Sequence, residues 1–253
     1  MIPRHLGSEF FGIDSNGNPN KIADIIARRR LKQYYRWHII DRFFVDPGLN
    51  KGSSPQYVTL DVIGAMILAG WWGCTMKELK WKKERNDVQI PYLAHIIEIN
   101  SFREWLVNNA KVAGHLPGVW KVEHHNYVSF EMDELNYRLE PDGYCQYWFN
   151  KEDGFHFFYE HDRGTMSLKQ WKEKIARYQL YFDSRHWQKD SELQFPIVLC
   201  TTTTWKRTEE LSALCAETNV VWFFTSYENG FTDEWIESST EGKIQLFNTK
   251  DGA

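Results

Sequence analysis

The sequence predicts a fold that mixes helices and strands, of the α+β or α/β class. In the first third, apolar residues recur with helical spacing and are followed by two short extended runs. The second half alternates extended and helical runs, and residues 197–200 and 220–224 are unbroken apolar stretches, as expected of strands buried on both faces. A small N-terminal module followed by a larger α/β domain is therefore expected.

The N-terminal module begins with a predicted helix at residues 21–37, whose apolar and basic positions fall largely on opposite sides. Extended runs at 39–45 and 56–60 then flank a polar loop at 46–55. Helix, strand, loop and strand is the order of a winged helix. Asp61 is expected to cap a following apolar helix that starts at Val62.

Positive charge is concentrated at this end of the chain. Residues 1–60 contain nine lysines and arginines and five acids, a net charge of +4, whereas the whole chain carries −4. A basic segment on an acidic body suits an anionic partner held at one end. The candidate DNA-binding residues are Arg28, Arg29, Lys32, Arg36 and Lys51.

The cysteines and the hydropathy pattern indicate the compartment. The four cysteines lie far apart with no C-x-x-C pair, which is typical of reduced thiols in a cytosolic protein. There is no signal-peptide pattern and no apolar run near 18 residues. We expect a cytoplasmic protein without a membrane partner.

The second half has a regular order of predicted elements. Residues 73–90 are charged and irregular, which suggests a boundary, and a helix is expected at 92–111. The predicted domains are 1–75, a winged-helix-like DNA-binding domain, 76–110, a connecting segment, and 111–253, an α/β domain. Within the last, strands are expected at 137–140, 143–149, 155–161, 195–201 and 220–226, and helices at 167–182 and 205–216.

Three acidic residues in this domain could form a chemical site. Asp142 precedes a predicted hairpin, and Glu160 and Asp162 lie two apart on the strand that leaves it, so they project to one face. Carboxylates brought together repel and require a cation or raised pKa values. Oxygen ligands of this kind suit Mg²⁺ or Mn²⁺, which could orient water against a phosphodiester. Lys174 on the next helix could hold a phosphate oxygen, although exposed acids and lysines can also be simply solvated.

Several short segments of the chain share a pattern with a known family. They are residues 138–144 and 159–165, with Lys174 and Tyr178 following, and further upstream residues 28–31, 56–61 and 92–95. Together they resemble the replication-relaxation family of bacterial plasmids and conjugative elements, and the resemblance spans roughly residues 21–226.

The resemblance implies DNA binding, a role in plasmid replication and relaxation, and a restriction-endonuclease-like mixed sheet flanked by helices, similar to the PD-(D/E)XK class. Asp142 would match the first acid of that pattern and Glu160 the second. The chain departs at the third position, where Asp162 stands in place of a lysine, so that Lys174 or Arg163 would have to replace it.

Three hypotheses follow. The leading one is a DNA-binding accessory protein of a mobile element that works with a relaxase or replication initiator and could form a homodimer. The second is a divalent-metal endonuclease, or nickase, with Asp142, Glu160 and Asp162 as metal ligands and Lys174 as a further catalytic residue. The third is a winged-helix transcriptional regulator.

Overall fold

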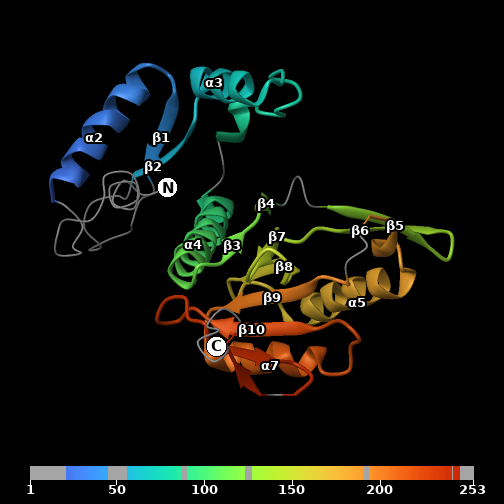
Figure 1. The fold of residues 1–253 in the computed structure, drawn as a ribbon. Helices are drawn as coiled ribbons and strands as arrows, with labels where there is room; N and C mark the ends of the chain where they lie inside the picture. The colour runs from blue at the N-terminus through green and yellow to red at the C-terminus, as the bar shows by residue number, and fades with distance from the viewer. Residues whose placement is uncertain are drawn as a thin grey trace. The chain divides into compact units, whose positions relative to one another are not determined.

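The computed structural model describes residues 21–44, 56–86, 90–122, 127–190, 194–240 and 242–245. The fold is mixed α/β, as the sequence predicts, and it divides into two compact units, Met1–Ile97 and Glu98–Ala253, each described here by itself (Figure 1). Within the described ranges, no helix is both long and apolar enough to cross a membrane.

The first unit is built around a β-hairpin. Strands β1 (Ile40–Phe44) and β2 (Gln56–Leu60) pair antiparallel, with helix α2 (Lys21–Arg36) before them and helix α3 (Val62–Trp72) after them. A short 3₁₀ helix, η1 (Lys83–Asn86), follows. Asp61 caps α3 as expected, because its side chain accepts a hydrogen bond of 2.7 Å from the backbone N–H of Val62.

Helix α3 packs on the hairpin through its small residues. Gly64, Ala65 and Ala69 are buried, whereas the larger Met66 and Trp71 are exposed. A Cβ atom added to Gly64 would lie 2.0 Å from the carbonyl oxygen of Ile39. The close approach of helix and hairpin therefore requires glycine at position 64.

The second unit contains a mixed sheet of eight strands within the described residues. Along the sheet the order is β12, β11, β10, β9, β8, β7 and β3, and β4 also pairs with β7. The central strands β8, β9 and β10 are parallel, and their neighbours are antiparallel. The strands are β3 (Leu116–Pro117), β4 (Lys121–Val122), β7 (Gly143–Trp148), β8 (Gly154–Asp162), β9 (Ile197–Thr202), β10 (Trp222–Ser226), β11 (Trp235–Glu237) and β12 (Lys243–Ile244).

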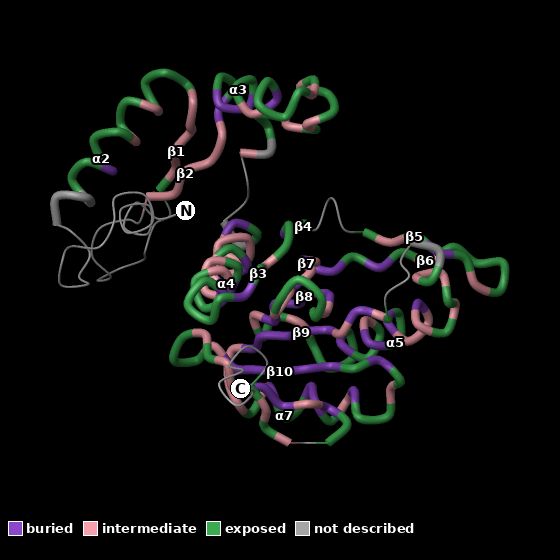
Figure 2. Tube along the Cα trace, in the orientation of Figure 1, coloured by how far each residue is buried: buried purple, intermediate pink, exposed green. Residues whose placement is uncertain are grey.

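Helices cover both faces of this sheet. Apolar residues of α4 (Ile90–Ala113) from Ile99 onward pack on one face. Those of α5 (Leu168–Ser184) and α7 (Trp205–Cys215) pack on the other. The central strands are buried almost throughout (Figure 2). A separate hairpin, β5 (Val128–Met132) with β6 (Leu135–Leu139), packs against α5, and a short helix, α6 (Trp187–Asp190), follows α5.

Successive residues of β8 face opposite sides, because side chains alternate along a strand. Phe157 and Tyr159 belong to the core on the α4 side, and Phe158 to the core on the α5 side. Glu160 and Asp162 bond to side chains of α5. The two carboxylates thus share a face, as their spacing predicted.

Candidate nucleic-acid interface and buried ionic centre

The basic residues predicted on α2 are displayed at the surface. Arg28, Arg29, Lys32 and Arg36 are all exposed. Arg28, Lys32 and Arg36 follow i, i+4, i+8 spacing and so line one side of the helix. Within the described part of the chain, Arg29, Lys32 and Arg36 make no ion pair. The fifth predicted residue, Lys51, lies outside the described residues.

Side-chain and backbone contacts join the hairpin to helix α2. The guanidinium of Arg42 on β1 lies 4.1 Å from the ring centroid of Tyr35 on α2, a cation–π contact. The rings of Phe43 on β1 and Tyr57 on β2 stack, with their centroids 5.9 Å apart. The backbone N–H of Ile39 donates to the carbonyl of Tyr34 at 2.9 Å. The basic helix and the hairpin therefore form one local structure.

Glu160 is the centre of a buried ionic cluster in the second unit. Its side chain is only 1% exposed and forms an ion pair with Nζ of Lys174, whose own side chain is 21% exposed. The hydroxyl of Tyr178 donates to Oε1 of Glu160 at 2.6 Å. Lys174 and Tyr178 lie one turn apart on α5, so that one face of the helix holds both oxygens of the carboxylate.

Asp142 belongs to the same region. It is buried just before β7, and its Oδ2 accepts a hydrogen bond of 2.7 Å from the backbone N–H of His161. Its negative charge raises the pKa of Glu160 and of Lys174. The first acid, the second acid and the lysine that the sequence singled out are therefore electrostatically coupled.

Burial dominates the proton equilibrium of Glu160. It raises the pKa of Glu160 to about 7, an effect that the positive charge of Lys174 opposes and that of Asp142 reinforces. Burial alone would lower the pKa of Lys174, but the charges of Glu160 and Asp142 outweigh it and hold that pKa above its ordinary value. Lys174 therefore stays protonated at neutral pH, whereas Glu160 titrates near it.

Asp162 is engaged separately. Its Oδ2 pairs with Nε of Arg207 at 2.7 Å, and its Oδ1 accepts from Nε1 of Trp171 at 3.2 Å. Arg207 also donates to the carbonyl of Met166 at 2.7 Å. This ion pair joins β8 to α7, and no sequence pattern predicted it because 45 residues separate the partners.

The three carboxylates that the sequence predicted as metal ligands each have other partners in the structure. Among the residues that the structure describes, no group of three or more His, Cys, Asp or Glu side chains could hold a metal ion. The physical reason is that protein cations already balance the acids: Lys174 pairs with Glu160, and Arg207 with Asp162. With both oxygens of Glu160 accepting hydrogen bonds, the residues as they stand do not fit a divalent ion.

Arg163, the alternative substitute for the missing lysine, points to different partners. Its Nε pairs with Oε2 of Glu98 on α4 at 2.7 Å, and the same oxygen accepts from Nε2 of His161 at 3.1 Å. Nδ1 of His161 lies 2.7 Å from the hydroxyl of Thr201. This network fastens α4 to the sheet, and it leaves Lys174 as the cation beside Glu160.

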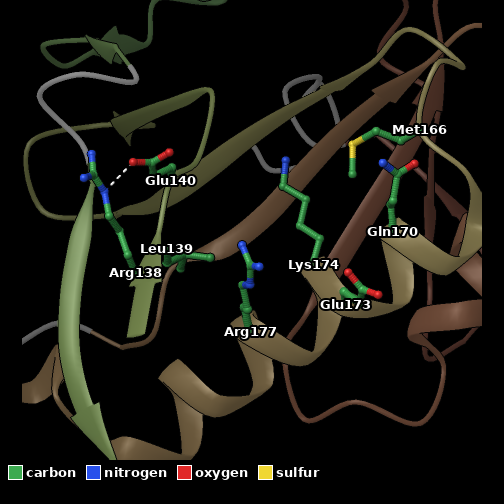
Figure 3. A pocket seen from close by; sticks show the side chains of 8 residues that line it. All are labelled: Arg138, Leu139, Glu140, Met166, Gln170, Glu173, Lys174 and Arg177. Atoms are coloured by element: carbon green, nitrogen blue, oxygen red, sulfur yellow. Dashed lines mark ion pairs between the residues drawn. The ribbon is translucent and has the colours of Figure 1, made fainter. Parts of the chain in front are cut away.

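Lys174 also borders the pocket drawn in Figure 3, which has a volume of about 410 Å³. The pocket lies between the end of β6 and helix α5. Figure 3 shows the side chains of Lys174 and Arg177 rising from α5 into it, while Arg138 pairs with Glu140 at the far side. The lining residues are Arg138, Leu139, Glu140, Met166, Gln170, Glu173, Lys174 and Arg177.

The fold and these sites define a mixed α/β protein of two units, one with an exposed basic helix beside a hairpin and one with a buried ionic centre next to a charged pocket. The family model described as Replication-relaxation matches residues 17–196. The chain belongs to the replication-relaxation family, and this membership indicates a role in replication or relaxation. No curated protein and no solved structure matched the chain significantly.

Proposed function

We propose that this chain is a DNA-binding accessory protein of a bacterial plasmid or similar mobile element, acting in its replication or relaxation. In this proposal α2 and the β1–β2 hairpin act as a winged helix that grips the DNA backbone. The second unit, with its nuclease-like core, supplies a further contact surface or docks a relaxase or replication initiator. Its expected location is the cytoplasm. A homodimer is one of the assemblies that this proposal allows.

The observation that carries this proposal is the exposed basic face of α2. Arg29, Lys32 and Arg36 are solvent-facing cations without an ion-pair partner in the described structure, although the chain as a whole is acidic. Contacts of lysine and arginine with phosphates supply most of the sequence-independent affinity of proteins for DNA. A local excess of positive charge beside a hairpin is therefore best explained by DNA.

The test is the salt dependence of duplex binding by the full chain. We expect Arg29→Ala, Lys32→Ala and Arg36→Ala together to weaken binding of a labelled duplex in fluorescence anisotropy. Each lost phosphate contact should lower the slope of log K against log salt by about 0.9, which gives about 2.7 for all three.

The matched control changes three exposed lysines of the second unit, Lys169, Lys172 and Lys206, to alanine. The net charge then changes equally, but α2 stays intact. An unchanged slope in the α2 variant, or the same loss in the control, would mean that α2 is not the DNA contact.

A second candidate function is a divalent-metal endonuclease that uses Asp142, Glu160 and Lys174. The observation that favours it is the coupling of these three groups in the second unit. Mg²⁺ or Mn²⁺ would be needed to stabilise the charge that develops on a cleaved phosphodiester. A metal site there would require Lys174 or Tyr178 to release Glu160 first.

A further inference from the structure

The pocket beside α5 has one wall lined by hydrogen-bond donors. Gln170, Lys174 and Arg177 line it, and their i, i+4, i+7 spacing places them on one face of the helix. This stripe is about 10 Å long, since a helix rises about 1.5 Å per residue. The wall can therefore meet a ligand at more than one point along its length.

Each of these three side chains has an N–H donor that is available to a ligand. Oε1 of Gln170 accepts from the backbone N–H of Ser167 at 2.8 Å, so its amide nitrogen remains as a donor. Lys174 has three N–H donors and bonds Glu160 from the buried side. Arg177 is exposed and makes no ion pair with a described residue. An acceptor-rich anion is the chemistry that satisfies such a set.

The acids of the lining divide into two kinds. Glu140 is neutralised by its ion pair with Arg138. Glu173 is exposed and has no ion pair in the described part of the chain. A bound anion would therefore be attracted chiefly by Arg177, since Glu160 offsets much of the charge of Lys174, and repelled chiefly by Glu173. Glu173 and Arg177 carry opposite charges, so removing each charge should change the affinity of the pocket for an anion in opposite directions.

We propose that this pocket binds a phosphate of a single DNA strand. The inference rests on the proposed function and places the second unit's contact with DNA. A guanidinium such as that of Arg177 presents paired donors that match phosphate oxygens. A volume of about 410 Å³ is near the lower end of small-ligand sites, so the pocket admits a nucleotide of one strand and not a duplex. Met166, which also lines the pocket, offers apolar contact to the sugar or base.

The experiment measures binding of a labelled octathymidylate to the full chain by fluorescence anisotropy. Arg177→Ala should weaken binding about tenfold and lower the salt slope by about 0.7, the value for one phosphate contact on a single strand. Glu173→Gln should tighten binding about two- to threefold, because a repulsive charge is removed. Lys172→Ala, an exposed cation of α5 outside the pocket, is the matched control and should bind as the wild type does.

Competition with thymidine monophosphate and with inorganic phosphate separates the sources of the anion. Both should compete at least a hundredfold more weakly than unlabelled octathymidylate. Equal competition would assign the pocket to a free phosphate compound and overturn the proposal. Wild-type affinity in Arg177→Ala, or an equal loss in Lys172→Ala, would overturn it as well.

The outcomes also separate this inference from the proposed function. The α2 triple variant should lose duplex binding and keep the Arg177-dependent part of octathymidylate binding. Loss of duplex binding in the α2 variant, with no effect of Arg177→Ala on the single strand, would leave the proposed function standing and remove the pocket. The reverse result would keep the pocket and remove α2 as the interface.

Discussion

At the scale of single residues, Glu160 shows how the second unit balances its buried charge. A carboxylate taken out of water is costly unless it is neutralised or paired. Lys174 and Tyr178 supply a charge and a hydrogen bond from one helix, yet burial and Asp142 still raise its pKa to about 7. The centre is therefore sensitive to pH near neutrality.

This sensitivity should appear in the stability of the protein. Between pH 4.5 and 7, folded Glu160 keeps a proton that the unfolded chain releases, so the free energy of unfolding must fall as pH rises through this window. The fall amounts to at most about 3 kcal/mol. In Glu160→Gln this contribution is absent, and urea unfolding from pH 4.5 to 8 should show a flatter profile than in the wild type.

The matched control is Glu152→Gln, which changes an exposed carboxyl in the loop between β7 and β8. It should keep the wild-type slope, because an exposed carboxyl is hydrated in both states. Parallel profiles for the wild type and Glu160→Gln would show that Glu160 ionises at ordinary pH in the folded protein.

At the scale of elements, long periodic segments were predictable and short or long-range features were not. Helices α2, α5 and α7 and strands β7 to β10 lie where the sequence pattern predicts them. Strands such as β3 and β12 have two residues each, too few to show an alternation. The β5–β6 turn uses Asp133 and Glu134, both with positive φ, in place of the usual Asn-Gly, so most of that hairpin escaped prediction.

The candidate site was also predictable only in part from the sequence. Glu160, Lys174 and Tyr178 follow from the alternation of a strand and the turn of a helix. The partners of Asp162 and His161 do not, because Arg207 and Glu98 come from helices distant in the sequence. Only the packing of α4 and α7 brings them to the sheet. The pairing of Asp162 with Arg207 was likewise not part of the three-carboxylate prediction, which remains a prediction.

The packing of helix α3 on the hairpin can be tested with two glycine substitutions. Gly64→Ala should destabilise the first unit by about 1–3 kcal/mol, because the new methyl group collides with the backbone at Ile39. Gly70→Ala, in the same helix with open space around it, should stabilise by about 0.5–1 kcal/mol through helix propensity. Hydrogen exchange of α2 and α3 amides measures both. Equal protection in the two variants would contradict the close approach at Gly64.

At the scale of the whole molecule, the two units contribute different chemistry to one proposed task. Among the residues that the structure describes, Arg29, Lys32 and Arg36 on α2 of the first unit are exposed and form no ion pair. In the second unit, Lys174 and Arg207 instead form internal ion pairs with Glu160 and Asp162. Internal pairs such as Lys174–Glu160 and Arg207–Asp162 fasten helices to the sheet. Exposed cations remain available to an external anion. From this division we expect the molecule to bind DNA and not to cleave it.

Incubation of supercoiled plasmid with the full chain and Mg²⁺ or Mn²⁺ tests that conclusion directly. We expect DNA to be bound, as a gel shift under the same conditions would show, but no nicked circle to accumulate. The physical reason is that a metal ion would have to displace Lys174 or Tyr178 from a carboxylate already fully occupied. Metal-dependent nicking that Glu160→Ala and Lys174→Ala abolish, and that Glu173→Gln retains, would establish the endonuclease instead. Nicking that persists in Glu160→Ala would identify a contaminating nuclease, and the ionic centre would keep its structural role.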